Sequence, residues 1–251
     1  PYFITKQARW YPGKFTRLLY EAKRAKCESG ILPLMKLNTI FIDLDDTIYP
    51  HASGVWPRIR SRIDQYLLEV MQFDPQEAAS LRRQMVEQYG TTLRGLQTMY
   101  QVDEASYLAF VHDVPVEDLL KPDPELRKML AGIQTRKFIF TNADHIHANR
   151  VLAVLDVAAC FDDIIDIHRL APYCKPMVEA YQIAMSVAGE NDPNNCLLVD
   201  DMPANLDAAR NLGFHTILVR DAGLPSVAEN HHVVIQRLTD LPQALDAWGH
   251  T

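Results

Sequence analysis

Four groups of polar residues, three of which follow apolar runs, are the candidates for chemistry in this sequence. The first is Asp43-Leu44-Asp45-Asp46-Thr47, in which three carboxylates stand close together. Like charges at this spacing are tolerated when a cation or a proton compensates them, and carboxylate oxygens suit a hard ion such as Mg²⁺. The run by itself also fits a solvated acidic loop, so it leaves both interpretations open.

The other three groups narrow this choice. They are Thr141-Asn142, Lys175, and Asp200-Asp201, and two of the three directly follow β-branched or aromatic runs. Singly, each has an ordinary explanation as a helix cap or a solvated side chain. Together they supply a hydroxyl, an ammonium and a second acidic pair, which is the inventory needed to bind a phosphoryl group with Mg²⁺.

Short apolar runs that alternate with helical stretches position these groups. The expected strands are Thr39–Leu44, Lys137–Thr141, Asp163–Ile167, Cys196–Asp200, His215–Val219 and Val233–Ile235. Helices are expected between most of them, at Ile146–Val157, Pro176–Ala188 and Ala204–Leu212. Runs that are apolar on both faces are typical of buried parallel strands. The pattern predicts an α/β fold with a doubly wound, Rossmann-like parallel sheet, and the polar groups would meet at the carboxyl edge of that sheet.

One connection is far longer than the others. More than ninety residues separate the first strand from Lys137, and they show helical patterns at Val55–Met71, Ala78–Tyr89, Thr92–Tyr100, Glu104–His112 and Asp123–Ala131. A helical insert after the first strand would lie over the site as a cap. We therefore expect a core formed by residues 35–54 and 134–251, and a cap formed by residues 55–133.

Composition excludes several classes of protein. The formal net charge of −7 argues against a nucleic-acid binder, and a hydrophobic fraction of 48% with 23% charged residues is normal for a globular domain. No apolar run approaches the length of a membrane span, and we expect a cytoplasmic protein that does not bind membranes. The four cysteines stand singly, which fits reduced thiols, and Cys174 is expected to be a semi-buried thiol without chemistry.

Residues 1–34 differ from the rest of the chain. They carry seven Lys or Arg and two Glu, a local charge of +5. We interpret them as a basic N-terminal extension outside the native domain, because Met35 could serve as a start immediately before the first strand. A surface arm for an anionic partner is the alternative.

The four groups, in this order, resemble the signatures of the haloacid dehalogenase superfamily of phosphohydrolases. The resemblance covers the chain from about Lys36 onward and implies a mechanism. Asp43 would be the nucleophile that forms an aspartyl-phosphate, and Asp45 would be the general acid and base. The phosphoryl group would be bound by Thr141, Asn142 and Lys175, and Mg²⁺ by Asp43, the backbone carbonyl of Asp45, Asp200 and Asp201.

The cap would decide the substrate. Asp43–Tyr49, the stretch Tyr89–Leu96, Tyr107–Asp113 and Leu120–Pro124 are similar to the pyrimidine 5′-nucleotidase branch of the superfamily. That similarity implies UMP- or CMP-type monophosphates as substrates. The candidate substrate contacts are Thr91, Thr92 and Arg94, with Tyr49 near the entrance, although the same stretch also fits a simple turn between helices.

Rival functions share most of these residues. A capped phosphatase or phosphomutase acting on sugar phosphates or phosphoglycolate would keep the same core. A non-catalytic module that binds phosphate or accepts a phosphoryl group is a more distant alternative, and its usual chain order of acidic groups differs. Dehalogenation is disfavoured because it has no leaving alkoxide for Asp45 to protonate. The expected partner is a small phosphorylated metabolite, and the expected assembly is a monomer or homodimer.

The histidines are assigned no metal. His112-Asp113 is expected to be a helix end rather than a catalytic pair. His145 and His147 stand two apart in a predicted helix, where their side chains would not face each other, so zinc is rejected for both. His51 is weakly placed near the entrance, and His231-His232 is expected in a loop.

Overall fold

The computed structural model describes residues 37–221 and 233–247. The predicted extension 1–34, the proposed start at Met35, Cys27 and the predicted loop at His231-His232 lie outside these residues. Among the described helices, none combines the length and apolarity needed to cross a membrane.

A six-stranded parallel sheet forms the centre of the described chain, in the order β3-β2-β1-β4-β5-β6. The strands are β1 (Thr39–Ile42), β2 (Arg136–Phe140), β3 (Asp163–Ile165), β4 (Cys196–Asp200), β5 (His215–Val219) and β6 (Val233–Ile235). The order reverses at β1, which pairs with both β2 and β4. Ligand sites of open parallel sheets form at such switch points, beyond the carboxyl ends of the strands.

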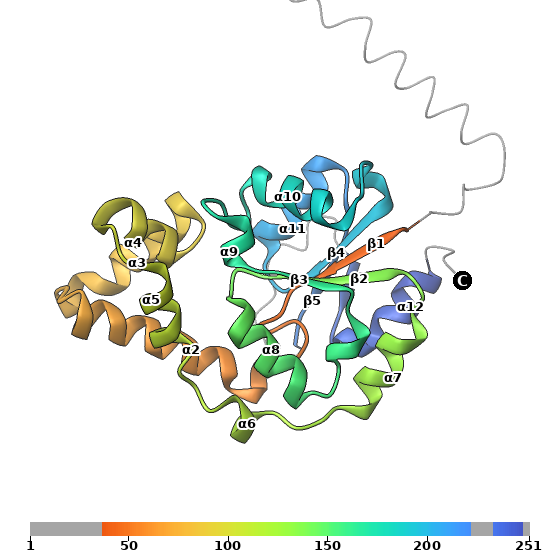
Figure 1. Cartoon of the computed structure of the whole chain (residues 1–251), viewed down its shortest axis with the longest axis horizontal. Helices are drawn as coiled ribbons and strands as arrows, with labels where there is room; N and C mark the ends of the chain where they lie inside the picture. The colour runs from red at the N-terminus through yellow and green to blue at the C-terminus, as the bar shows by residue number, and fades with distance from the viewer. Residues whose placement is uncertain (1–36, 222–232, 248–251) are drawn as a thin grey trace, which may run out of the picture. The chain divides into compact units, whose positions relative to one another are not determined.

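Helices cover both faces of this sheet (Figure 1). In β1 the side chains of Ile40 and Ile42 join one apolar cluster, and Phe41 between them joins another, because successive side chains of a strand point to opposite faces. The Phe41 face is covered by α10 (Val178–Ala188) and α11 (Pro203–Leu212). The opposite face is covered by α7 (Pro124–Gly132), α8 (His145–Val154) and α12 (Leu241–Asp246). Two short helices, α6 (Val116–Leu119) and α9 (Ile167–Leu170), lie in the connections.

The helical insert has an apolar core of its own. Its helices are α2 (Val55–Gln65), which continues as a π-helix over Tyr66–Val70, then α3 (Pro75–Tyr89), α4 (Thr92–Tyr100) and α5 (Glu104–Val111). The buried side chains of the π-helix, α3, α4 and α5 form a third cluster, which Ile167 and Cys174 of the core also join. The buried side chains of α2, Val55 and Ile59, belong instead to the cluster on the sheet. The insert appears in orange and yellow in Figure 1. The predicted α/β fold with a cap after the first strand is therefore confirmed.

The far end of the predicted cap packs differently. Leu126 and Leu130 of α7, and Val116 of α6, belong to the cluster on the sheet, not to the cluster of the cap. We therefore propose that the cap ends near His112 instead of at residue 133. Periodicity alone could not place this boundary, because it identifies the apolar face of a helix but not the partner that covers it.

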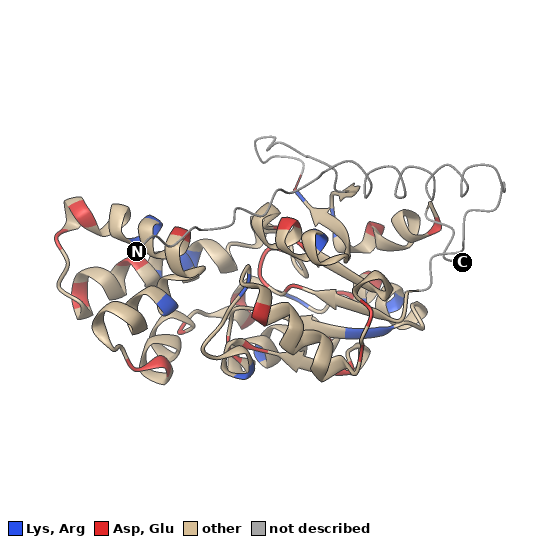
Figure 2. Ribbon diagram, turned by 90° about the horizontal axis from the view of Figure 1, so that it is seen from above, with Lys and Arg blue, Asp and Glu red and all other residues tan. Residues whose placement is uncertain are grey.

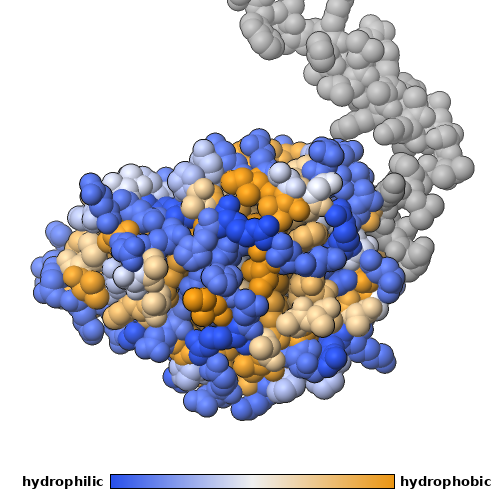
Figure 3. Space-filling view, in the orientation of Figure 1, coloured by the Kyte–Doolittle hydropathy of each residue, from blue (hydrophilic) through white to orange (hydrophobic). Residues whose placement is uncertain are grey.

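Most predicted elements were found within a few residues of their predicted ends. The strand β1 stops at Ile42, two residues before its predicted end, so that Asp43 opens a loop in which Asp46 has a φ of +58°. The pattern did not predict α6, α9 or α12, which are short. Charged side chains of both signs are interspersed over cap and core (Figure 2), and apolar side chains reach the viewed surface in separate patches (Figure 3).

Candidate active site

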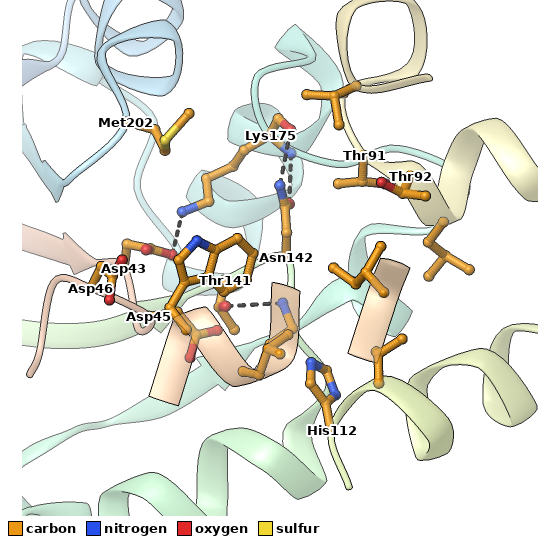
Figure 4. Close-up of a pocket in the computed structure, with 18 of the residues that line it drawn as sticks. Asp43, Asp45, Asp46, Thr91, Thr92, His112, Thr141, Asn142, Lys175 and Met202 are labelled. Atoms are coloured by element: carbon orange, nitrogen blue, oxygen red, sulfur yellow. Dashed lines mark hydrogen bonds and ion pairs between the residues drawn. The ribbon is translucent and has the colours of Figure 1, made fainter. Parts of the chain in front are cut away.

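A chamber of about 230 Å³ lies between the carboxyl edge of the sheet and the cap. The core contributes its polar wall, drawn in Figure 4, which includes Asp43, Asp45, Thr141 and Lys175. The cap contributes mainly apolar and aromatic side chains. They are Trp56, Ile59, Ile63, Val86, Leu93, Tyr107, Leu108 and Val111.

Lys175 is the electrostatic centre of the polar wall. Its ammonium donates to Asp43 Oδ1 and to Asp200 Oδ2, both at 2.7 Å, and the residue is only 1% exposed. Burial alone would lower the pKa of this lysine, but the two carboxylates, Asp200 foremost, raise it above its usual value. Lys175 therefore stays charged and binds the ends of β1 and β4 together.

The loop that carries Lys175 is held by Asn142. The amide of Asn142 donates to the carbonyl of Lys175 at 3.0 Å, and it accepts from the backbone N–H of Lys175 at 2.9 Å. This reciprocal pair uses one N–H and one oxygen lone pair of the Asn142 amide. Asn142 also lines the chamber, and its predicted contact with phosphate stays a prediction.

Asp200 is also held on several sides. Its carboxylate accepts from the amide of Asn205 at 3.0 and 3.1 Å, and from the backbone N–H of Met202 at 2.8 Å. Asn205 lies in the first turn of α11, five residues after Asp200. The sequence analysis did not single out Asn205, although its place in the helix that follows the acidic pair is a usable signal.

Three carboxylates gather where a cation could bind. One oxygen from each of Asp43, Asp200 and Asp201 lies within 4.8 Å of the others. Burial raises the pKa of Asp43 to about 7 against the opposing effect of Lys175, and burial with the charge of Asp200 raises the pKa of Asp201 well above its usual value. The single ammonium of Lys175 does not balance this charge, so the three side chains form a plausible ligand set for a metal.

Asp45 is oriented through one of its two oxygens. The hydroxyl of Tyr49 donates to Oδ1 of Asp45, and Nε2 of His147 lies 2.9 Å from the same oxygen. Burial would raise the pKa of Asp45, but the interactions with His147 and Tyr49 lower it overall. Tyr49 was predicted near the substrate entrance; it is instead buried and does not line the chamber, and its hydroxyl donates to Asp45.

Thr141 lies where the sequence placed it. It follows the end of β2, lines the chamber, and its Oγ1 accepts from the backbone N–H of Ala143 at 3.0 Å. That bond uses a lone pair of the hydroxyl and leaves its hydrogen to be donated to a ligand. The side chain can therefore serve the predicted contact with a phosphoryl oxygen.

The predicted substrate residues of the cap divide into two groups. Thr91 and Thr92 line the chamber, opposite the polar wall (Figure 4). Arg94 does not line it. This arginine is 5% exposed, and its guanidinium donates to Glu104, Gln97 and the carbonyls of Ile167 and Tyr173. Arg94 therefore does not take the predicted substrate role. Its guanidinium instead joins the cap to the core.

The histidines also take unexpected partners. His112 ends α5 as predicted, but its Nδ1 lies 3.0 Å from Asp144 instead of pairing with Asp113, and its ring stacks on His147 at a centroid distance of 4.5 Å. His145 and His147 point to different partners, Asp166 and Asp45, as their spacing predicted. His51 pairs with Asp46 at 2.5 Å between Nδ1 and Oδ2. His147 was considered only as a metal ligand, and its contact with Asp45, 102 residues away, had no signal in the local pattern.

Comparison with known proteins gives this geometry a family. The profile of the haloacid dehalogenase-like hydrolases matches residues 37–213, which cover the sheet edge, the cap and all four polar groups. This chain belongs to that family. Its membership agrees with the resemblance that the four polar groups carry.

A curated relative of this haloacid dehalogenase-like hydrolase is Phosphate metabolism protein 8 of Saccharomyces cerevisiae. The two are 28% identical over 192 residues, which make up 71% of this chain and 60% of the yeast protein. The chain therefore spans less than two thirds of the length of this relative.

Solved structures of the haloacid dehalogenase fold are similar throughout the described domain. The L-2-haloacid dehalogenase of Xanthobacter autotrophicus, with chloropropionic acid covalently bound, matches with a TM-score of 0.53 at 17% identity, over 84% of this chain and 98% of that one. The magnesium-bound hydrolase YfnB of Bacillus subtilis matches with a TM-score of 0.55 at 17% identity, over 84% of this chain and 99% of that one. A HAD phosphatase from Thermococcus onnurineus matches with a TM-score of 0.56 at 15% identity, over 83% of this chain and 98% of that one. At these identities the likeness establishes the fold alone.

Proposed function

We propose that this protein is a Mg²⁺-dependent phosphomonoester hydrolase that works through an aspartyl-phosphate on Asp43. The observation that carries the proposal is the arrangement of two carboxylates at the end of β1. Asp43 is bound to the Lys175 ammonium, and Asp45, two residues on, is held through Oδ1 by Tyr49 and His147. A nucleophile and a separately oriented acid beside one chamber are the parts that phosphoryl transfer through aspartate requires.

Mg²⁺ fits the acidic cluster by its donor chemistry. Asp43, Asp200 and Asp201 offer only oxygen ligands, which a hard ion prefers, and burial together with the neighbouring carboxylates raises the pKa of Asp43 and Asp201, so a cation that binds there would favour their ionised forms. When bound, the ion would neutralise charge on the phosphoryl oxygens. The similar structure from Bacillus subtilis, which has magnesium bound, supports the same choice.

In the first half-reaction, a carboxylate oxygen of Asp43 attacks phosphorus in line with the leaving oxygen. The bond from phosphorus to the leaving oxygen breaks, and that oxygen takes the proton of Asp45. Lys175 and Thr141 bind the phosphoryl oxygens and orient the group. The pKa of Asp45 is low in the free protein, and an arriving dianionic phosphate raises it because like charges oppose ionisation.

In the second half-reaction, the ionised Asp45 accepts a proton from water. The water oxygen attacks phosphorus, the bond between phosphorus and the Asp43 oxygen breaks, and inorganic phosphate leaves. The lowered pKa of Asp45 suits this role as a base. Asp43 is restored as a carboxylate beside Lys175.

Asp45 favours this chemistry over dehalogenation. Halide needs no proton when it leaves, so a dehalogenase gains nothing from a carboxylate that two donors hold beside the nucleophile. The dehalogenases among the similar structures share the fold, which hosts both reactions.

For the substrate, we favour a pyrimidine nucleoside 5′-monophosphate such as UMP or CMP. The cap wall is mostly apolar and includes the aromatic rings of Trp56 and Tyr107, which suit a planar base, and the hydroxyls of Thr91 and Thr92 can bond its polar edge. The resemblance of the cap sequence to pyrimidine 5′-nucleotidases supports the same class.

The alternatives fit the chamber less well. A sugar phosphate would bring several hydroxyls against Ile59, Ile63 and Val86, where few groups could pair with them. Phosphoglycolate would need a cation for its carboxylate in addition to the groups that bind its phosphate; Arg82 lines the chamber but is ion-paired with Asp64 at 3.0 Å. A module that only accepts a phosphoryl group has no use for a second, oriented carboxylate.

The deciding experiment measures phosphate release from UMP, CMP, dUMP, AMP, GMP, phosphoglycolate and several sugar phosphates, each with Mg²⁺ and with EDTA. We expect Mg²⁺-dependent release that is fastest with UMP and CMP. Preference for a sugar phosphate would keep the hydrolase and overturn the nucleotide assignment. No release from any of them, or from p-nitrophenyl phosphate, would overturn the proposed function.

A further inference from the structure

The general acid is held by an unusual pair of donors. Tyr49 and His147 both contact Oδ1 of Asp45, and the side chain of His147 has no exposed surface. Tyr49 comes from the loop after β1, whereas His147 comes from the first turn of α8. Since two fixed groups contact Oδ1, the rotation of the carboxyl group is restricted. Oδ2 is then the oxygen that remains available for proton transfer.

The hydrogen on His147 can be placed from its surroundings. Its Nδ1 is buried and has no hydrogen-bond partner among the described residues. A neutral imidazole carries one N–H, and if that hydrogen is on Nε2 it is donated to Asp45. A hydrogen on Nδ1 would instead be buried without an acceptor and would leave two acceptors facing each other at 2.9 Å. His147 is therefore the donor to Asp45 through Nε2.

The imidazole of His147 is itself fixed on two sides. Its own backbone N–H donates to Asp144 Oδ1 at 2.7 Å, which caps α8, while the other oxygen of Asp144 lies 3.0 Å from Nδ1 of His112. The rings of His112 and His147 stack with an interplanar angle of 12°. One carboxylate thus sets the backbone of His147 and the ring that packs against it.

We propose that His147 is a positioning residue that, with Tyr49, holds Asp45 by Oδ1 so that Oδ2 gives and takes the proton. This inference rests on the proposed phosphomonoesterase function. It assigns a role to a histidine that touches neither the phosphoryl group nor the acidic cluster at Asp200. A purely structural role would be served equally well by an apolar side chain, which would not bury an imidazole with an unpaired nitrogen.

The proposal predicts a dependence on the leaving group. An alkoxide leaving group, such as that of a nucleoside 5′-monophosphate, needs a proton as its bond to phosphorus breaks. A p-nitrophenolate leaving group is stable without one. Losing the orientation of Asp45 should therefore slow the first half-reaction with an alkyl phosphate, but hardly affect it with p-nitrophenyl phosphate. The second half-reaction uses the same base for both and should slow for both.

The experiment compares wild type with His147→Leu, which removes the donor and keeps an apolar side chain. Rapid mixing follows the burst of p-nitrophenolate and the subsequent steady release, and single-turnover assays follow an alkyl phosphate that the wild type hydrolyses. We expect an unchanged burst rate, a steady rate lower by about 10- to 100-fold, and a similar loss in the single-turnover rate of the alkyl phosphate. KM should change little. His147→Gln, whose amide can donate from a similar place, should recover part of the loss.

Two further variants separate positioning from general damage. In an Asp45→Asn background, His147→Leu should cause no additional loss, because the residue that it positions is already disabled. His145→Leu is the matched control, since His145 is in the same turn of α8, its side chain is 58% exposed and it contacts Asp166. It should behave as wild type. If His147→Leu does not fold, Tyr49→Phe removes the other donor to Oδ1 and should show the same dependence on the leaving group.

Three results would overturn the inference. They are an equal loss of the burst rate and of the alkyl phosphate rate, an undiminished loss in the Asp45→Asn background, and wild-type kinetics in both His147→Leu and Tyr49→Phe. Failure of the proposed function looks different, because the wild-type protein itself would then release no phosphate from any substrate.

Discussion

At the edge of the sheet, the polar side chains of the site are held by several partners, whereas the cap presents mostly apolar side chains to the same chamber. Lys175 bridges two carboxylates, and Asp200 accepts bonds from an asparagine and a backbone N–H. The facing cap wall includes Ile59, Val86 and Leu93. In the proposed function, the sheet edge carries out the reaction on the phosphoryl group, and the apolar cap excludes water and selects the substrate by shape.

The largest effect should come from the sheet edge. Asp43→Asn removes the nucleophile, and we expect turnover to fall by at least about 10⁴-fold. The fold should persist, because burial already makes the charge of Asp43 unfavourable and raises its pKa to about 7. Phosphate release and the thermal midpoint are the two measurements.

The control for this variant is Asp113→Asn at the end of the cap, where the carboxylate is 80% exposed. It should keep full turnover. Retained activity in a pure preparation of Asp43→Asn would remove the nucleophile from the proposed mechanism.

Arg94→Ala should have the next largest effect, on stability. Deleting the guanidinium removes the side-chain donor to the carbonyls of Ile167 and Tyr173 and one of the partners of Glu104, so the free energy of unfolding should fall by about 2–4 kcal/mol. Urea denaturation measures it, with Arg60→Ala on the exposed face of α2 as the control. The ratio of rates on UMP and p-nitrophenyl phosphate should stay constant; a changed ratio with unchanged stability would return Arg94 to substrate binding.

Gly90 tests how closely the cap approaches the loop of Lys175. Its φ is +81°, and a Cβ there would lie 2.7 Å from Cys174 Sγ and 3.1 Å from the carbonyl oxygen of Lys175. Gly90→Ala combines backbone strain with this clash, so we expect a loss of about 2–3 kcal/mol in the free energy of unfolding together with lower turnover.

Gly54 provides the matched control for this variant. Its φ of +82° is almost the same, but no atom of the described residues lies within 4 Å of an added Cβ. Gly54→Ala should therefore show the cost of the backbone alone, about 1 kcal/mol. Equal losses in both variants would mean that the contact between Gly90 and the Lys175 loop adds nothing.

Metal binding should depend on pH at the sheet edge. Because the pKa of Asp43 is raised to about 7, this group is mostly protonated below that pH, and a cation must displace the proton. Apparent Mg²⁺ affinity, measured by thermal shift, should increase by about tenfold between roughly pH 6 and pH 8. The increase should shrink in Asp43→Asn, which has no proton to displace there. An unchanged dependence would assign the titration to another group.

The sequence predicted the sheet edge better than the cap, for a physical reason. Parallel strands bring their carboxyl ends together, so Asp43, Thr141, Lys175 and Asp200 could be grouped from order and strand position alone. His147 could not be assigned, because its partner Asp45 is 102 residues away and helical spacing compares a residue only with its neighbours on the helix.

For polar residues of the cap and the loops, the sequence could not predict which groups they contact. Arg94 and Tyr49 have polar groups that fit a ligand or an internal partner equally well, and only the packed structure shows which groups their donors meet. The guanidinium of Arg94 donates to Glu104 and two backbone carbonyls, and the hydroxyl of Tyr49 donates to Asp45. Polar side chains near a site therefore carry less information in a sequence when no regular element fixes their direction.

Thr92 is where the cap should contribute its smallest measurable effect. Thr92 is buried at the start of α4 and lines the chamber, so Thr92→Val keeps the shape and removes one hydroxyl. A neutral hydrogen bond is worth about 0.5–1.5 kcal/mol, so kcat/KM for UMP should fall by up to about tenfold while p-nitrophenyl phosphate, which has no base, is hydrolysed as before. The two specificity constants measured side by side decide the matter. Equal losses on both substrates would give Thr92 a structural role only. Selection of the substrate by the cap would then depend on the shape of its apolar side chains alone.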